Sequence, residues 1–220
     1  ALAVQGLAAP HMGRIIDRGG APSAMTIGTV GAILGLGVLT QVTTLWQFYA
    51  VWGWLGLMMA ATLYDATFSI VTRARGPRAR SAITAITLAA GFASTLAYPL
   101  TAAVTAAGGW RAAIWVLAGM VAIIVLPLHR LASTRLEAEA LARDPASVAP
   151  PPATHAMGRP GFWPVGLGFA LTALGAAILL TNLLPLMDAL GVPGDLAILA
   201  ASVIGPAQVA KMKQGVVLIN

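Results

Sequence analysis

The stretch from Gly13 to Gln41 reads GRIIDRGGAPSAMTIGTVGAILGLGVLTQ and places three charged residues shortly before residues 24–41, which carry no charge. A helix needs about 20 mostly apolar residues to cross the hydrocarbon core of a bilayer. Across the whole chain 58% of the residues are hydrophobic and 9% are charged, whereas about 25% of residues are charged in a typical soluble domain. One soluble core cannot bury so much apolar surface, so the composition predicts an all-α bundle of membrane-spanning helices.

Apolar runs of similar length follow one another along the rest of the chain. Residues 1–10 are expected to be the last turns of a further span. We predict six complete spans, over residues 24–41, 46–69, 82–106, 111–128, 162–184 and 196–210.

The Lys and Arg residues fix the predicted orientation of these spans. All but one of the 13 basic residues fall on the same side of the membrane when the connecting segments are assigned to alternate sides. These residues are Arg14, Arg18, Arg73, Arg75, Arg78, Arg80, Arg130, Arg135, Arg143, Arg159, Lys211 and Lys213. Because basic loops remain in the cytoplasm, this side is predicted to be cytoplasmic. Arg111 is the basic residue on the other side, where a structural hydrogen bond to loop carbonyls is favoured over attraction of an anion.

One cytoplasmic segment, Arg130–Pro160, is long and rich in alanine, proline and charge. We therefore divide the chain into a helix bundle over residues 1–130, a cytoplasmic linker over 131–160, and two further helices over 161–220. Within the linker, residues 135–143 are predicted to form a short surface helix, and the prolines at 150–152 favour extended polyproline II. In the first span Gly28, Gly31 and Gly35 lie near one helix face, which predicts close helix–helix packing rather than a ligand site.

The motif Gly13-Arg14-Ile15-Ile16-Asp17-Arg18-Gly19-Gly20 resembles the signature G-x-x-x-D-R-x-G-x-R/K of the major facilitator superfamily. That signature lies in the cytoplasmic loop between the second and third helices, so the resemblance makes the six spans equivalent to helices three to eight. The linker then falls between the two six-helix halves. Pro22 stands where the family has a basic residue.

The resemblance also implies a role for the motif as a cytoplasmic latch that holds the outward-facing state. Gly13 and Gly20 are expected to let the chain turn at helix ends. Asp17 is expected to accept hydrogen bonds from helix N-terminal amides, and Arg18 to pair with a carboxylate on a neighbouring helix. The same residues also serve as a positive-inside anchor, whatever else they do.

Three further segments resemble bacterial carriers of monocarboxylates and of oxalate and formate: residues 64–68, residues 91–95 with Pro99, and residues 205–209. The resemblance implies alternating-access transport of a small organic mono- or dicarboxylate across a bacterial inner membrane, with proton coupling left open. A drug exporter of the same superfamily is the alternative. It is disfavoured because residues 98–101 read YPLT instead of the antiporter ending, and because the fourth family helix has no arginine within its span.

Asp65 is the acid expected well inside a span, where a carboxylate is costly unless it has a partner or faces a cavity. Two interpretations stay open: a proton-binding or gating acid, and an ion pair with Arg18 or with the arginines at 73–80. Helices four, five, seven and eight line the cavity in the family. That makes a second group of residues candidates for the substrate path, comprising Tyr49, Trp52, Tyr64, Ser94, Tyr98 and Asn182. For Tyr49 and Trp52, packing within the bundle is favoured over a place in the cavity. Pro99 is expected to kink its helix and Pro185 to break the seventh helix.

No motif of a membrane-embedded enzyme is present in the sequence, and the three histidines lack metal-ligand spacing. We expect no enzymatic activity, no cofactor, no metal and no nucleic-acid partner; the expected partners are an organic anion, the lipid bilayer and further helices. If the resemblance holds, helix one, most of helix two and helices nine to twelve lie outside these 220 residues. We therefore expect that the isolated 220-residue chain does not transport, and a fragment without activity of its own is a third interpretation.

Overall fold

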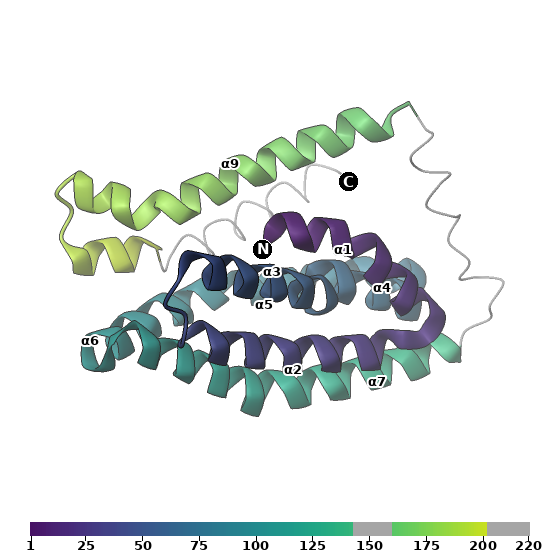
Figure 1. Cartoon of the computed structure of the whole chain (residues 1–220). Coiled ribbons are helices and arrows are strands. Elements are labelled where there is room, and N and C mark those ends of the chain that lie inside the picture. The colour runs from purple at the N-terminus through teal and green to yellow at the C-terminus, as the bar shows by residue number, and fades with distance from the viewer. Residues whose placement is uncertain (143–159, 202–220) are drawn as a thin grey trace. The chain divides into compact units, whose positions relative to one another are not determined.

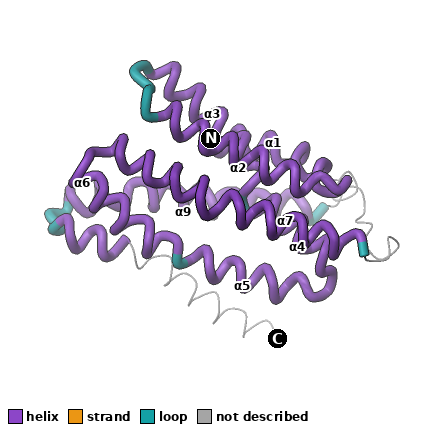
Figure 2. Tube along the Cα trace, turned by 90° about the horizontal axis from the view of Figure 1, so that it is seen from below, coloured by secondary structure: helices purple, strands orange, loops and turns teal. Residues whose placement is uncertain are grey.

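The computed structural model describes residues 1–142 and 160–201, and within these ranges the regular elements are helices, without any strand (Figures 1 and 2). The predicted all-α fold is confirmed. The chain divides into two compact units, one of Ala1–Ile86 with Ala103–Val148 and one of Thr87–Ala102 with Ala149–Asn220. We call them unit 1 and unit 2 and describe each by itself.

The first helical stretch of unit 1 is broken at the motif. Helix α1 (Leu2–Ile15) leads through one π-helical turn (Ile16–Gly20) into α2 (Ala21–Leu39). The helix tail predicted for residues 1–10 therefore continues past Pro10, which lies inside α1. A helix in lipid satisfies its backbone groups internally, so it continues until a residue forces a break. That residue is Gly19, whose φ of 91° is left-handed.

The next predicted span, 46–69, is divided into two helices, α3 (Leu45–Thr62) and α4 (Tyr64–Arg75). Leu63 between them is extended, with φ −86° and ψ −161°. The start of α3 is a capping box, in which Thr44 and Gln47 each bond to the backbone of the other. The break at Leu63 was not predicted, because neither glycine nor proline is close to it in the sequence.

A short 3-10 helix (Gly76–Arg78) precedes α5 (Ala79–Gly91), and Phe92 separates α5 from α6 (Ala93–Met120). The span predicted over 82–106 is therefore divided at Phe92. Gly109, with φ 77°, lies inside α6 at the predicted outer turn, 107–110.

One π-helical turn (Val121–Val125) joins α6 to α7 (Leu126–Leu141). Residues 131–141 of the predicted linker are helical, and the surface helix predicted at 135–143 is the end of α7 rather than a separate element. The polyproline segment lies outside the described residues.

Unit 2 contains α9 (Phe162–Ala189) and a shorter helix over residues 194–201. The axis of α9 bends by 42° between Leu179 and Thr181. Pro185 explains the bend, because its ring clashes with the carbonyl four residues earlier, at Thr181. The disruption expected at Pro185 is present as a bend, while the helix itself continues beyond the predicted end of the span at residue 184 to Ala189. The part of the span 196–210 beyond residue 201 lies outside the described residues.

The glycine face of α2 packs against α3, as the sequence predicts. A Cβ added at Gly28 would lie 2.7 Å from the Cβ of Ala61, and one at Gly35 would lie 2.6 Å from a methyl group of Leu55. Trp54 of α3 donates its indole N–H to the carbonyl of Gly31 over 2.8 Å. The opposite flank of α2 lies along α7 (Figure 1), so α2 is the central helix of the packing in unit 1.

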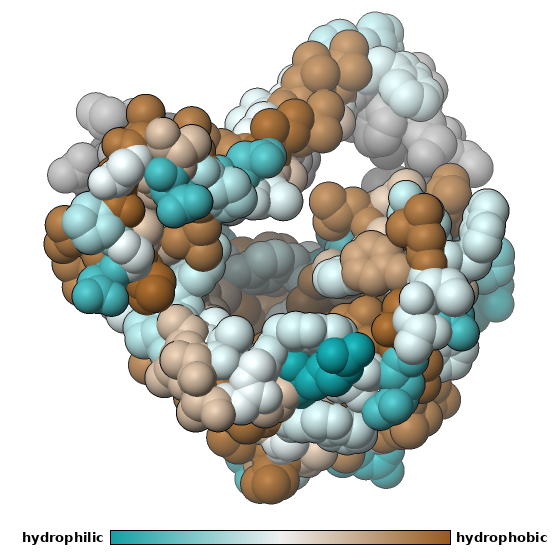
Figure 3. Space-filling view, turned by 60° about the vertical axis from the view of Figure 1, so that its left-hand side comes forward, coloured by the Kyte–Doolittle hydropathy of each residue, from teal (hydrophilic) through white to brown (hydrophobic). Residues whose placement is uncertain are grey.

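Many large apolar side chains lie on the outside of the helices, where Figure 3 shows them in brown. Ile27 of α2 is 67% exposed and Ile123 of the turn before α7 is 77% exposed. The stretches Leu2–Leu39 and Leu45–Leu141 are long and apolar enough to cross a membrane, and the bent helix α9 is too if its two parts form one span. Apolar surface of this extent suits lipid and not water.

Candidate functional site: a buried ion pair at the motif

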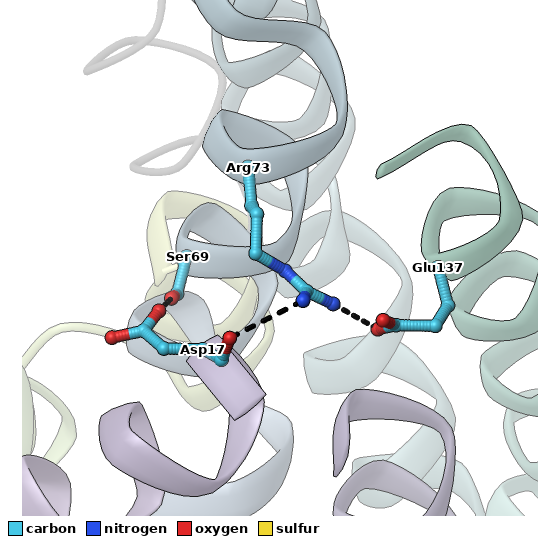
Figure 4. Close-up of polar contacts among 4 residues, drawn as sticks. All are labelled: Asp17, Ser69, Arg73 and Glu137. Carbon is cyan, nitrogen blue, oxygen red and sulfur yellow. Dashed lines mark hydrogen bonds and ion pairs between the residues drawn. The ribbon is translucent and has the colours of Figure 1, made fainter. Parts of the chain in front are cut away.

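The motif turn, the end of α4 and the end of α7 meet at one end of unit 1, which we call the basic end. Figure 4 shows the contacts that join them. The hydroxyl of Ser69 donates to Oδ1 of Asp17 over 3.3 Å, and Arg73 donates to the backbone carbonyl of Asp17 over 3.4 Å. The other side of the Arg73 guanidinium forms an ion pair with Glu137 of α7. Arg73, which belongs to α4, therefore joins the motif to α7.

The Arg73–Glu137 pair is buried, with side chains 14% and 10% exposed. Its hydrogen bonding is incomplete: Nε of Arg73 and Oε1 of Glu137 are buried without a partner. A Cβ added at Gly19 would lie 3.3 Å from that Oε1 atom. Gly19 thus supplies both the left-handed backbone of the turn and the space that the carboxylate occupies.

In the structure, the turn and the ion pair expected of the motif residues are formed by other residues than those predicted. Gly13 lies inside α1, and the turning residue is Gly19. Gly20 follows the turn with negative φ, and a Cβ there would lie 2.7 Å from the side chain of Ile15. The recorded partner of the Asp17 carboxylate is a hydroxyl rather than a helix amide. Arg18 is exposed and forms no ion pair with a described residue, and Arg73 pairs with the carboxylate instead.

A second ion pair lies beside the first, between Arg75 and Glu139. Nε and Nη2 of Arg75 donate to the two carboxylate oxygens over 3.0 and 3.2 Å. Both side chains are about half exposed, at 47% and 45%. In the two ion pairs the residue numbers rise together on both helices, from 73 and 137 to 75 and 139. The helices α4 and α7 therefore run in the same direction towards the basic end. Predicted basic segments from three different parts of the sequence therefore gather at one end.

Arg111 lies at the other end of unit 1, as the sequence predicts. Its Nε donates to the backbone carbonyl of Thr40 over 2.9 Å. Its guanidinium also stacks 4.3 Å above the Trp110 ring. The predicted structural role of Arg111 is confirmed, because it holds the end of α2 against α6.

Asp65 lies in the first turn of α4, directly after the break at Leu63, and its side chain is exposed. The positive end of the helix dipole favours a carboxylate there. The ion pair with Arg18 or with the arginines at 73–80 does not form among the described residues. The ring of Tyr64 lies 5.2 Å from that of Phe68. The proton-binding or gating role of Asp65 stays a prediction.

The candidates for the substrate path fall in both units. Tyr49 and Trp52 are exposed on α3, and the ring of Phe48 lies 6.1 and 6.0 Å from theirs. In unit 2, Tyr98 is half-buried and Asn182 donates to the carbonyl of Ile178 over 2.8 Å.

The side chain of Ser94 lies outside what the structure describes. A cavity shared by the candidates of the two units therefore stays a prediction.

A polar contact between α2 and α7 was not predicted from the sequence. The hydroxyl of Thr29, 2% exposed, lies 2.9 Å from Nδ1 of His129 and also donates to the carbonyl of Met25. A hydroxyl has one proton, so donation to the carbonyl leaves its oxygen to accept from Nδ1–H of His129. The isolated histidine beside an apolar run was the available signal, but nothing in the sequence pointed to its partner.

These features define a multi-pass α-helical membrane protein: its exterior is apolar, its long helices are interrupted at glycine, leucine and proline, and its ion pairs lie at one end of unit 1. The family model of the Major Facilitator Superfamily matches residues 1–212. The chain belongs to this family, whose members are secondary transporters of small solutes. Neither the curated proteins nor the solved structures that were compared with the chain gave a match.

Proposed function

We propose that the chain serves alternating-access transport of a small organic mono- or dicarboxylate, and that the Asp17–Arg73–Glu137 network is the latch of the cytoplasmic side. The observation that carries the proposal is the buried Arg73–Glu137 pair, which ties the family motif to the ends of α4 and α7. The membrane is proposed to be a bacterial inner membrane, with the basic end in the cytoplasm.

A buried ion pair suits a latch because a half-separated pair is less favourable than either the closed contact or two solvated charges. With both partners in contact, each charge compensates the desolvation of the other. When the helices separate, both charges must reach water or another partner, so an intermediate position is unfavourable. Small displacements are thereby converted into two discrete arrangements.

The proposed substrate class rests on the segments around Tyr64, Pro99 and Pro206, which resemble carriers of monocarboxylates, oxalate and formate. Asp65 is the proposed proton-binding or gating group, because it is an exposed carboxylate at a helix break, and broken helices form ion and substrate sites in transporters.

The exposed ring cluster of Phe48, Tyr49 and Trp52 favours a second candidate, a lipophilic or aromatic solute carried by a drug exporter of the same superfamily. Stacking on these rings would bind such a solute. Uptake distinguishes the two candidates. Because the isolated chain is expected not to transport, the cells produce it together with the further helices that the resemblance implies. They are given radiolabelled acetate, lactate and oxalate in one set, and a lipophilic cationic dye in the other. Uptake of the carboxylates supports the first candidate, and energy-dependent loss of the dye supports the second.

The latch is tested in the same uptake assay with two matched substitutions. Glu137→Gln removes the buried partner of Arg73 and is expected to change the uptake rate about tenfold or more, as the loss of a buried pair implies. Glu139→Gln removes the exposed partner of Arg75 and is expected to leave the rate within about twofold. Equal effects of the two substitutions would contradict the latch.

The proposed orientation is tested by labelling single cysteines in intact cells with an impermeant thiol reagent, since the chain has no native cysteine. The structure selects exposed positions: Gln41 and Ala107 near one end, and Ser81 and Ala138 near the other. Ala79 is unsuitable because it is buried. Labelling is expected at Gln41→Cys and Ala107→Cys, and labelling at Ser81→Cys or Ala138→Cys would contradict the orientation.

A further inference from the structure

A cavity of about 670 Å³ opens at the basic end, beside the second ion pair. It lies within unit 1, between the end of α4, the following 3-10 helix and the end of α7. Its lining residues are Ala74, Arg75, Pro77, Arg78, Glu139 and Ala142. Its volume falls within the usual range of small-molecule sites, about 300–1,000 Å³. None of its residues belongs to the Asp17–Arg73–Glu137 network.

The charges of the cavity do not cancel. Glu139 is already neutralised, because Arg75 holds both of its carboxylate oxygens. The guanidinium of Arg78 is exposed and forms no hydrogen bond or ion pair with a described residue. Among the described lining residues one positive charge is therefore left unpaired, and guanidinium groups bind phosphate through two parallel hydrogen bonds.

The other described residues of the cavity lining carry no charge. Ala74, Pro77 and Ala142 supply its uncharged walls. Leu141, next to Ala142 in the chain, is 75% exposed. The end of α7 therefore offers an exposed apolar side chain close to the cavity. A free phosphate would gain nothing from that surface, whereas the glycerol and first acyl carbons of a phospholipid would.

We propose that this cavity binds the phosphodiester headgroup of an anionic phospholipid, such as phosphatidylglycerol, with Arg78 and Arg75 as its phosphate ligands. The basic residues of the loop before α5 attract anionic lipid, and the cavity fixes one molecule of it. Because Arg75 also holds Glu139, a bound phosphate competes with that carboxylate for the guanidinium. Lipid binding in this cavity does not depend on which substrate the transporter carries.

The test is a lipid titration of the purified full chain in detergent, followed by native mass spectrometry. Phosphatidylglycerol and phosphatidylcholine with the same acyl chains are compared. One phosphatidylglycerol is expected to bind in preference, and Arg78→Gln to weaken its binding about fivefold, the effect of one basic residue beside an anionic membrane surface. Arg78→Lys is expected to retain most of the binding, which separates loss of charge from loss of folding.

Arg135→Gln is the matched control, because Arg135 is an exposed arginine of α7 that does not line the cavity. Equal binding of the two lipids, or equal weakening by Arg135→Gln and Arg78→Gln, would overturn the proposal in favour of diffuse attraction. A third arm adds sodium phosphate against sodium chloride of the same ionic strength. Equal displacement of the lipid by both salts supports the proposal, and selective displacement by phosphate would identify a soluble anion as the ligand and overturn it.

Discussion

Removal of the Glu137 charge is expected to destabilise unit 1 far more than removal of the Glu139 charge, although both residues pair with arginines of α4. The side chains of Arg73 and Glu137 are 14% and 10% exposed, whereas those of Arg75 and Glu139 are 47% and 45% exposed. Loss of one partner of a buried pair costs about 3–5 kcal/mol, because the remaining charge is left uncompensated. An exposed pair contributes about 0.2–1 kcal/mol.

The measurement is the free energy of unfolding of the purified chain in mixed micelles, from titration with dodecyl sulfate and the helical circular dichroism signal. Glu137→Gln is expected to lower it by about 3 kcal/mol, the lower part of the range, because about a tenth of each side chain reaches solvent. Glu139→Gln is expected to lower it by less than about 1 kcal/mol.

A double substitution that removes both charges tests the physical cause. In Arg73→Met with Glu137→Leu both charges are gone, so the value is expected to return to within about 1 kcal/mol of the parent chain. The atoms Nε of Arg73 and Oε1 of Glu137, which are buried without a partner, make this recovery easier. A double variant as unstable as Glu137→Gln would refute the reasoning, and so would equal losses from Glu137→Gln and Glu139→Gln.

The remaining predictions use the same unfolding measurement. Gly19→Ala is expected to lower the free energy of unfolding by about 1–2 kcal/mol, because the φ of Gly19 is 91°. Gly13→Ala is the control: Gly13 lies inside α1 with open space around it, so this change is expected to raise the free energy of unfolding by up to about 1 kcal/mol. The reverse order would contradict the assignment of the turn to Gly19. Gly31→Ala is expected to lower stability by about 1–3 kcal/mol, because its Cβ would overlap the side chain of Met58. Gly53→Ala, on α3 with nothing within 4 Å, is the control, and a loss as large there would show that the effect is not one of helix packing. Arg111→Ala is expected to lower stability by about 1–3 kcal/mol, because the buried Thr40 end of α2 loses a charged donor, and to leave carboxylate uptake within about twofold. A tenfold loss of uptake with unchanged stability would instead indicate a role in attracting the anion.

Sequence patterns predicted those structural features that depend on residues close together in the chain. The apolar runs predicted the helices, the glycine spacing of α2 predicted its packing on α3, and Pro185 predicted the bend of α9. Arg111 was assigned correctly because a lone arginine at a tight turn has loop carbonyls within reach.

The candidate site was harder to predict from the sequence, because it depends on contacts between segments that are distant in the chain. Arg73 and Glu137 are 64 residues apart in sequence. Glu137 falls in a stretch whose charge and alanine content are typical of a solvated linker, so its burial was not predicted. The turn at Gly19 was missed because the motif contains three glycines and its pattern does not distinguish the left-handed one.

The incomplete hydrogen bonding of the Arg73–Glu137 pair is itself consistent with a contact that must open. A guanidinium has five N–H donors, and a carboxylate has four lone-pair positions. A buried pair built for stability alone would fill more of these positions; even the exposed Arg75–Glu139 pair forms two bonds, one to each carboxylate oxygen. Here one donor and one oxygen stay buried without a partner, which reduces the stabilisation of the closed contact while the penalty for a single unpaired charge remains high. The pair is thereby specific for its partners and yet closer in energy to its open state, and a latch that opens in every transport cycle needs both properties.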